Sequence, residues 1–224
     1  YVFTGAEKLK DETRRLWSER YGVRIFEGYG ATETAPVLAM NSPMHNQPGS
    51  VGKLVPGLLH RLDPVPGIET GGRLWVYGPN VMSGYLRVED PGRIQPPEDG
   101  WYDTGDIVSI DKDGYVRIQG RAKRFAKIGG EMVSLAAVEA MVAELWPDFR
   151  HAVVSLPDPK KGEQLVLATD NPEATRDLVS TYARDRGIAA INLPARIMVV
   201  KAIPLLGTGK IDYRTLTTLV EEGG

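Results

Sequence analysis

The segment GYGATE at residues 28–33 brings together the side chains that a nucleotide site needs. The ring of Tyr29 could stack on a purine, the hydroxyl of Thr32 could hydrogen-bond a phosphate oxygen, and the carboxylate of Glu33 could hold Mg²⁺. The segment nearly matches the dinucleotide pattern G-x-G-x-x-G, but Glu33 replaces the third glycine and would repel a pyrophosphate. Taken alone, the segment fits an ordinary surface turn better.

A carboxylate and a lysine elsewhere in the chain could serve the sugar and the phosphates. Asp106 ends the segment YDTGD, and a carboxylate at the mouth of a strand can accept hydrogen bonds from two ribose hydroxyls. Lys210 ends the segment GTGK, but the P-loop pattern G-x-x-x-x-G-K-[ST] fails, because Pro204 and Ile211 occupy two required positions. By themselves, Asp106 fits a turn and Lys210 a solvated loop.

A pair of glycines, Gly129 and Gly130, lies within the segment KIGGE at residues 127–131. Such a pair permits close approach of the backbone to a ligand, or unusual backbone dihedrals. The alternative interpretation is a plain turn before a helix.

The composition excludes several other chemistries. The absence of cysteine excludes disulfides, thiolate nucleophiles and cysteine-ligated metals. Three histidines are too few for most histidine-rich metal centres, and no serine stands in the G-x-S-x-G pattern of a nucleophile elbow. The 27 basic and 29 acidic residues give a net charge of −2, which argues against a nucleic-acid partner. No apolar run approaches the ~20 residues of a membrane span.

The elements that must position these residues are short in the first half of the chain. The pattern predicts strands over residues 1–4 and 23–26, with a helix over residues 7–21 that places Leu9, Leu16 and Trp17 on one face. Residues 51–86 predict short strands, as in a small barrel or sandwich, of which 74–77 is the clearest. A hairpin over residues 106–119 turns at the segment DKDG.

The second half of the chain mixes strands and helices, which is typical of a small α+β domain. Ser134 is expected to cap a helix that Pro147 ends, and a second helix is expected over residues 172–186. The remaining elements are strands over residues 152–156, 164–169 and 196–200, and a final helix over residues 213–222. At 224 residues the chain suits one large or two small domains. We place the boundary between residues 121 and 122.

The order and spacing of these segments carry more information than any one of them. Six segments in this order resemble the carboxylate-adenylating superfamily of acyl-CoA synthetases, adenylation domains and luciferases. They are YGATE, the stretch from Gly72 to Leu86, YDTGD, Gly120-Arg121, residues 127–139 and Gly209-Lys210. The segments GRAKRFAKIGGEMVSL and LLGTGK resemble in particular the synthetase part of the bacterial bifunctional acyl-acyl-carrier-protein synthetase / 2-acylglycerophosphoethanolamine acyltransferase family.

The resemblance implies an α/β and α+β architecture. Residues 1–121 would form the end of a large AMP-binding domain with a small β-barrel-like subdomain, and residues 122–224 a small mobile α+β domain. The sequence does not begin with Met, and we expect it to be the C-terminal part of a longer enzyme that is inactive by itself.

The resemblance also implies a reaction, in which a fatty acid and ATP give acyl-AMP and an acyl carrier protein thiol, or CoA, then takes the acyl group. Lys210 would contact the carboxylate and the α-phosphate, Glu33 would hold Mg²⁺, and Thr32 a phosphate oxygen. Tyr29 and Gly30 would line the adenine site with Ile118 nearby, and Asp106 would bind the ribose with help from Arg121. Lys123 would be the hinge, and the loop with Gly129 and Gly130 would line the entry of the phosphopantetheine thiol.

Two alternatives remain open. The acceptor could be CoA alone, which makes the protein a fatty acyl-CoA ligase. A second class is a non-catalytic module that docks a carrier protein. The resemblance further implies a cytoplasmic protein whose full-length form associates with the inner membrane and serves lysophospholipid reacylation.

Overall fold

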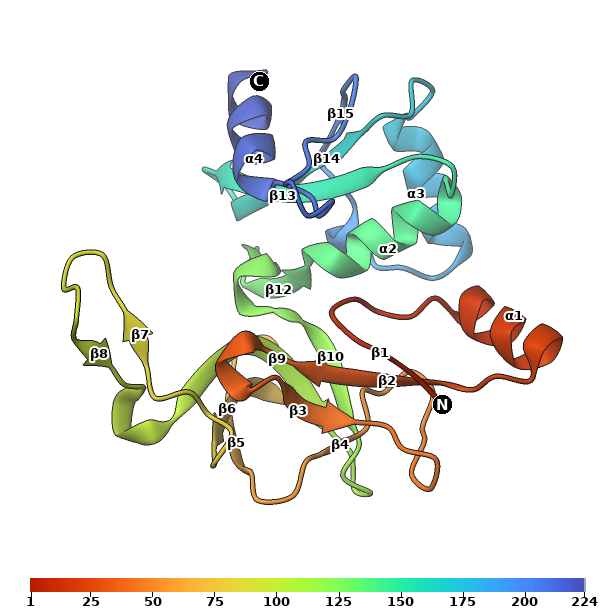
Figure 1. Ribbon diagram of the computed structural model, residues 1–224. Coiled ribbons are helices and arrows are strands. Elements are labelled where there is room, and N and C mark those ends of the chain that lie inside the picture. Colours follow the sequence, from red (N-terminus) through yellow and green to blue (C-terminus); the bar gives the residue numbers. More distant parts are fainter. Residues whose placement is uncertain (224) are drawn as a thin grey trace. The chain divides into compact units, whose positions relative to one another are not determined.

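The computed structural model describes residues 1–223, and the chain divides into two compact units (Figure 1). The first comprises residues 1–122, and the second begins at Lys123. No helix among the described residues is long and apolar enough to cross a bilayer.

The first sheet of unit 1 contains the GYGATE segment. Its strand order is β1-β2-β3-β4, with β1 (Val2–Thr4) parallel to β2 (Ile25–Gly30), and with β3 (Val37–Met40) and β4 (Lys53–Leu54) antiparallel. Parallel neighbours need a crossover connection, and α1 (Asp11–Tyr21) supplies it.

Two predictions for this region were wrong in their bounds. The helix begins at Asp11 rather than at residue 7, because Ala6 has a positive φ of 70° and Lys10 is still extended, so Leu9 is not part of it. The second strand does not stop at residue 26 but continues to Gly30, because its glycines pair with β3. The tyrosine of the motif therefore lies in a strand and not in a turn.

Gly30 is needed for a close backbone approach. A Cβ atom at Gly30 would lie 1.8 Å from the carbonyl oxygen of Pro36, whose oxygen also accepts a 2.8 Å hydrogen bond from the amide of Ala31. We expect Gly30→Ala to reduce the free energy of unfolding by more than about 2 kcal/mol, because the strand must move to relieve the overlap. Denaturant midpoints measure this effect.

Gly28→Ala in the same strand is the matched control. Its Cβ would make an ordinary 3.4 Å contact with the carbonyl oxygen of Ala39. Equal losses of stability in the two variants would contradict the steric explanation.

The second sheet of unit 1 has the antiparallel order β10-β9-β6-β5. Its strands are β5 (Leu59–Asp63), β6 (Gly72–Tyr77), β9 (Tyr102–Ile110) and β10 (Val116–Arg121). A single bridge between Lys53 and Tyr115 connects it to the first sheet, and no strand pairing among residues 1–223 closes it into the expected barrel. The hairpin of β7 (Tyr85–Leu86) and β8 (Ile94–Gln95) projects from the rest of unit 1 (Figure 1).

Alternate residues of these strands form the core of unit 1. The core joins both sheets and contains the ring of Tyr29, and its other fully buried members are Leu38, Ala39, Leu74, Val76, Val108 and Val116. Burial of one such aliphatic side chain contributes about 1.5–3 kcal/mol.

Unit 2 is built on one mixed sheet with helices on both faces. The strands are β11 (Phe125–Ile128), β12 (Glu131–Ser134), β13 (His151–Asp158), β14 (Gly162–Thr169) and β15 (Arg196–Val199). Alternating residues of β13 and β14 face opposite sides, as a pleated strand requires. Val153 and Leu167 pack with α2 (Leu135–Leu145) and α3 (Arg176–Asp185), whereas Val154 and Ala168 pack with α4 (Tyr213–Glu222).

The helices predicted for unit 2 are all present, but the predicted first residue of one of them is wrong. The predicted cap is confirmed, because the Ser134 side chain accepts a 3.2 Å hydrogen bond from the amide of Ala137. The next helix begins at Arg176 and not at residue 172, since Thr175 is its cap. The hairpin of β11 and β12 was not predicted, and it includes residues 127–131, which were expected to form a turn before the helix.

Candidate functional site

A buried carboxylate on β9 organises the candidate site in unit 1. Asp106 is 5% exposed and accepts a hydrogen bond from the hydroxyl of Tyr29 on β2. Arg121 lies opposite Asp106 in the β9–β10 register, and its Nε is 2.8 Å from Oδ1 of Asp106. The structure thus brings together three residues that are far apart in the sequence and that were each predicted from a different segment.

The electrostatics of this cluster follow from burial. Desolvation raises the pKa of Asp106, although the Tyr29 hydroxyl and the Arg121 charge oppose that rise. Burial and the neighbouring carboxylate also raise the pKa of Tyr29, so its hydroxyl stays protonated and donates. An ionised carboxylate has about four acceptor positions. Each oxygen of Asp106 faces one donor, so the carboxylate can still accept hydrogen bonds from the hydroxyls of a ligand.

The exposed surface of Tyr29 is smaller than the area that a purine stacked on its ring would cover. Tyr29 is 9% exposed and packs in the core of unit 1 with Leu38 and Val76. The hydroxyl that holds Asp106 is therefore its most evident contribution in the structure.

Glu33 lies in the short 3₁₀ segment Thr32–Thr34 that follows β2. Its Oε1 accepts a 2.6 Å hydrogen bond from the hydroxyl of Tyr85, which lowers the pKa of the Glu33 carboxyl. Tyr102 and the charge of Arg121 act in the same direction, so Glu33 stays ionised near neutral pH. Sequence reasoning missed the role of Tyr85, because the two residues are 52 positions apart and no spacing rule connects them.

The backbone around Glu33 is held by the loop after β6. Asn80 donates to the carbonyl oxygens of Thr34 and Val37, at 2.9 and 2.8 Å, and the amide of Met82 donates to the Glu33 carbonyl at 2.8 Å. These bonds fix the segment, while the side chain of Thr32 is exposed and makes no hydrogen bond within residues 1–223.

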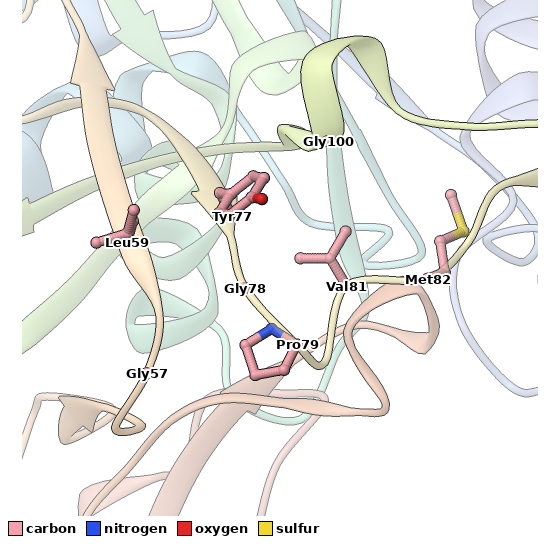
Figure 2. A pocket seen from close by; sticks show the side chains of 8 residues that line it. All are labelled: Gly57, Leu59, Tyr77, Gly78, Pro79, Val81, Met82 and Gly100. Atoms are coloured by element: carbon pink, nitrogen blue, oxygen red, sulfur yellow. The ribbon is translucent and has the colours of Figure 1, made fainter.

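A cavity of about 360 Å³ lies on this same loop but outside the candidate site (Figure 2). Leu59, Tyr77, Pro79, Val81 and Met82 line it, together with Gly57, Gly78 and Gly100. None of the predicted site residues lines this cavity, so it gives them no additional support.

The residues around Glu33 fit Mg²⁺ if a bound polyphosphate supplies the other ligands. Magnesium is usually held by one or two carboxylates, with substrate phosphates and water completing the octahedron. Glu33 is ionised, while Asp106 is paired with Arg121 and Asp103 with Arg73. No group of three or more acidic or histidine residues that could hold a metal occurs in the described part of the chain. A single carboxylate beside a bound polyphosphate therefore fits, and a protein-only metal site does not.

The remaining predicted site residues are Ile118, which belongs to β10, and three residues of unit 2. Ile118 is 43% exposed on β10, opposite Val108. In unit 2, Gly129 and Gly130 form the tip of the β11–β12 hairpin with φ values of 59° and 96°, as a two-residue hairpin turn of the primed type requires. Their positive φ values account for both glycines without a ligand.

Lys210 lies in an exposed loop of unit 2 between β15 and α4. The loop closes on itself, because Leu205 bridges Ile211 and the amide of Leu206 donates to the carbonyl of Lys210 at 2.8 Å. The Lys210 ammonium forms no ion pair with any residue from 1 to 223. A solvated cation on a glycine-containing loop is available to neutralise an anionic ligand.

Comparisons with known proteins place these features in a family. Residues 1–86 match the family model described as AMP-binding enzyme. A probable CoA ligase of Humulus lupulus is 32% identical over 88% of this chain and 39% of its own. A long-chain-fatty-acid–CoA ligase of Yersinia pestis is 32% identical over 95% of this chain and 39% of its own. The structure of ATP-bound MatB from Rhodopseudomonas palustris aligns with a TM-score of 0.78 and 29% identity, covering 97% of this chain and 44% of that one.

The chain thus spans about two fifths of the length of the curated relatives that it matches. The alignments cover nearly all of both units, and the predicted superfamily is confirmed. The chain belongs to the adenylate-forming, AMP-binding superfamily and corresponds to the carboxyl-terminal portion of its acyl-CoA ligase-like members.

Proposed function

We propose that this chain provides the ribose-binding and lysine-bearing parts of an enzyme that activates a fatty acid with ATP and passes the acyl group to a phosphopantetheine thiol. The observation that carries the proposal is the Asp106 cluster, in which a buried carboxylate is oriented by Tyr29 and Arg121. Such a carboxylate suits the two vicinal hydroxyls of a ribose.

The first step needs charge neutralisation and no general base. A fatty carboxylate is ionised at pH 7 and attacks the α-phosphorus of ATP, with pyrophosphate leaving. Two anions must approach each other, so the rate depends on cations placed where charge develops. We assign this role to Lys210. Glu33 would hold Mg²⁺, which neutralises the phosphates when bound, and Thr32 would contact a phosphate oxygen.

The adenine would lie near Gly30 and Tyr29, with Ile118 as a weaker contact. In the second step the thiolate attacks the acyl carbonyl carbon and AMP leaves. The hairpin tip at Gly129 and Gly130 would line the path of the thiol, and Lys123 would be the hinge between a large domain that ends at residue 121 and a small mobile domain.

Acyl carrier protein is our first choice of acceptor, because the GRAKRFAKIGGEMVSL and LLGTGK segments resemble the bacterial acyl-carrier-protein synthetases. Similarity to the fatty-acid–CoA ligase of Yersinia pestis favours CoA as the second candidate. A synthetase of the first kind would serve lysophospholipid reacylation at the cytoplasmic face of the membrane.

The test uses the protein that carries this sequence at its full natural length. Fatty acids should support exchange of pyrophosphate into ATP, and acyl transfer should follow with carrier protein in the holo form. Transfer to CoA but not to carrier protein would favour the second candidate. Absence of exchange with every acid, while holo carrier protein still binds, would instead indicate a docking module without catalysis.

A further inference from the structure

A carboxylate in unit 2 joins the start of that unit to the end of the Lys210 loop. Glu139 on α2 is 18% exposed in its side chain, and its Oε1 accepts from Arg124 at 2.6 Å and from the amide of Val153 at 2.7 Å. The hydroxyl of Tyr213 lies 3.1 and 3.2 Å from the two oxygens of Glu139. Three different donors therefore converge on one carboxylate.

Arg124 and Tyr213 also contact each other directly. The guanidinium carbon of Arg124 lies 3.7 Å from the centre of the Tyr213 ring, and Nη1 of Arg124 donates to the Val153 carbonyl at 2.8 Å. Burial and the charge of Glu139 raise the pKa of Tyr213 to about 12. The hydroxyl thus remains a donor to Glu139 throughout the pH range in which enzymes are assayed.

The position of this cluster in the chain is what connects it to Lys210. Arg124 follows Lys123, the first residue of unit 2, and Tyr213 begins α4 three positions after Lys210. The two residues come from opposite ends of unit 2, and Glu139 holds them together.

The Lys210 loop has few other attachments. Residues 205–210 are all exposed, and the hydrogen bonds of Leu206 and Gly209 stay within the loop. The loop is fixed at its two ends, where Ile203 is buried in the core under α4 and Tyr213 binds Glu139. A segment with so few buried contacts takes its orientation from its anchors.

We propose that Tyr213 and Arg124 are positioning residues for Lys210. Through Glu139 they hold the carboxyl-terminal anchor of the loop against the first residues of unit 2, so that Lys210 keeps one orientation relative to the point where unit 2 begins. The catalytic part of this inference rests on the proposed function, whereas the anchoring part does not.

The test compares Tyr213→Phe with Val179→Ala in the full-length protein. Tyr213→Phe keeps the ring beneath Arg124 and removes one hydrogen bond to a charged group. We expect amide exchange in residues 205–212 to rise about 10-fold or more, which is the effect of losing such a bond. The rate of acyl-adenylate formation should fall about 10-fold with little change in the KM for ATP, and acyl transfer from supplied acyl-adenylate should be unchanged.

Val179→Ala is the matched control for lost stability. Val179 is 1% exposed on α3, in the core on the opposite face of the sheet from α4. We expect this variant to lower the melting temperature at least as much, with unchanged exchange in the loop and unchanged adenylation. Equal exchange in the two variants would overturn the proposal. A full-length protein with no adenylation at all would refute the proposed function, while the exchange measurement would still decide the anchoring.

Discussion

Replacement of Lys210 with alanine in the full-length protein is expected to slow acyl-adenylate formation about 10²–10³-fold, the usual cost of removing one group that stabilises developing charge. The loop itself should persist, because its closing hydrogen bonds are made by backbone atoms of residues 204–212. Transfer of the acyl group from supplied acyl-adenylate to the thiol should keep its rate, since the thiolate attacks the acyl carbonyl carbon in that step and we assign Lys210 only to the attack on the α-phosphorus. Single-turnover measurements of the two half-reactions give the comparison.

Lys201→Ala provides the control for loss of a positive charge. Lys201 is exposed in the same unit, two residues after the end of β15, the strand that leads to the loop. We expect it to leave both half-reactions unchanged. If Lys210→Ala slowed both half-reactions equally, the assignment of the lysine to the first step would be wrong.

Asp106→Asn is expected to weaken ATP binding about 10–100-fold. The substitution keeps the size of the side chain but removes the charge that holds Arg121 and accepts the Tyr29 hydroxyl. A hydrogen bond to a charged group is worth about 1.5–3 kcal/mol, which gives this range of affinity. Calorimetric titration with ATP or AMP measures the change directly.

Asp103→Asn is the matched control for this second prediction. Asp103 lies on the same strand and forms a comparable ion pair with Arg73, but we assign it no contact with nucleotide. It should reduce stability without weakening ATP binding. Equal weakening in the two variants would show that the loss reflects damage to β9 rather than a missing ribose contact.

The pH dependence of unfolding provides a second readout for Asp106. Burial raises its pKa above the ordinary value of 3.8. A carboxyl whose pKa is higher in the folded state binds more protons when folded, so its contribution to stability is lost as the pH rises through the folded-state pKa. Wild-type protein should therefore lose stability relative to Asp106→Asn as the pH rises above about 4. An opposite trend would mean that the pKa of Asp106 is lowered.

Signals in the sequence were sufficient to predict most of the helices and strands, and to predict the superfamily. Ser134 marks a helix start, and the DKDG turn joins β9 to β10, because caps and turns depend on neighbouring residues. Helix starts were less predictable, because Thr175 and Pro172 are both plausible first-turn residues and tertiary packing selects between them. Gly28 and Gly30 indicated a turn, whereas pairing with β3 extends the strand through them.

The parts of the site that could not be predicted are those made by distant pairs. The bond between Tyr29 and Asp106 joins residues 77 positions apart, and the contact of Tyr85 with Glu33 joins β7 to the 3₁₀ segment after β2. The motif order indicated that Tyr29 and Asp106 belong to one site, but not that the tyrosine holds the carboxylate. The Glu139 cluster was not predicted, because its members come from four elements and no spacing rule connects Arg124, Glu139 and Tyr213.

The two-sided covering of the sheet in unit 2 has a consequence for how such a protein can diversify. With α2 and α3 on one face and α4 on the other, residues 151–154 of β13 and 165–169 of β14 are buried and offer no side chains to another molecule. Hairpin tips and connecting loops remain, and loops tolerate insertions and replacements far better than packed strands. A lineage could therefore change its acceptor by altering a few exposed residues at the rim, without rebuilding the scaffold that supports them.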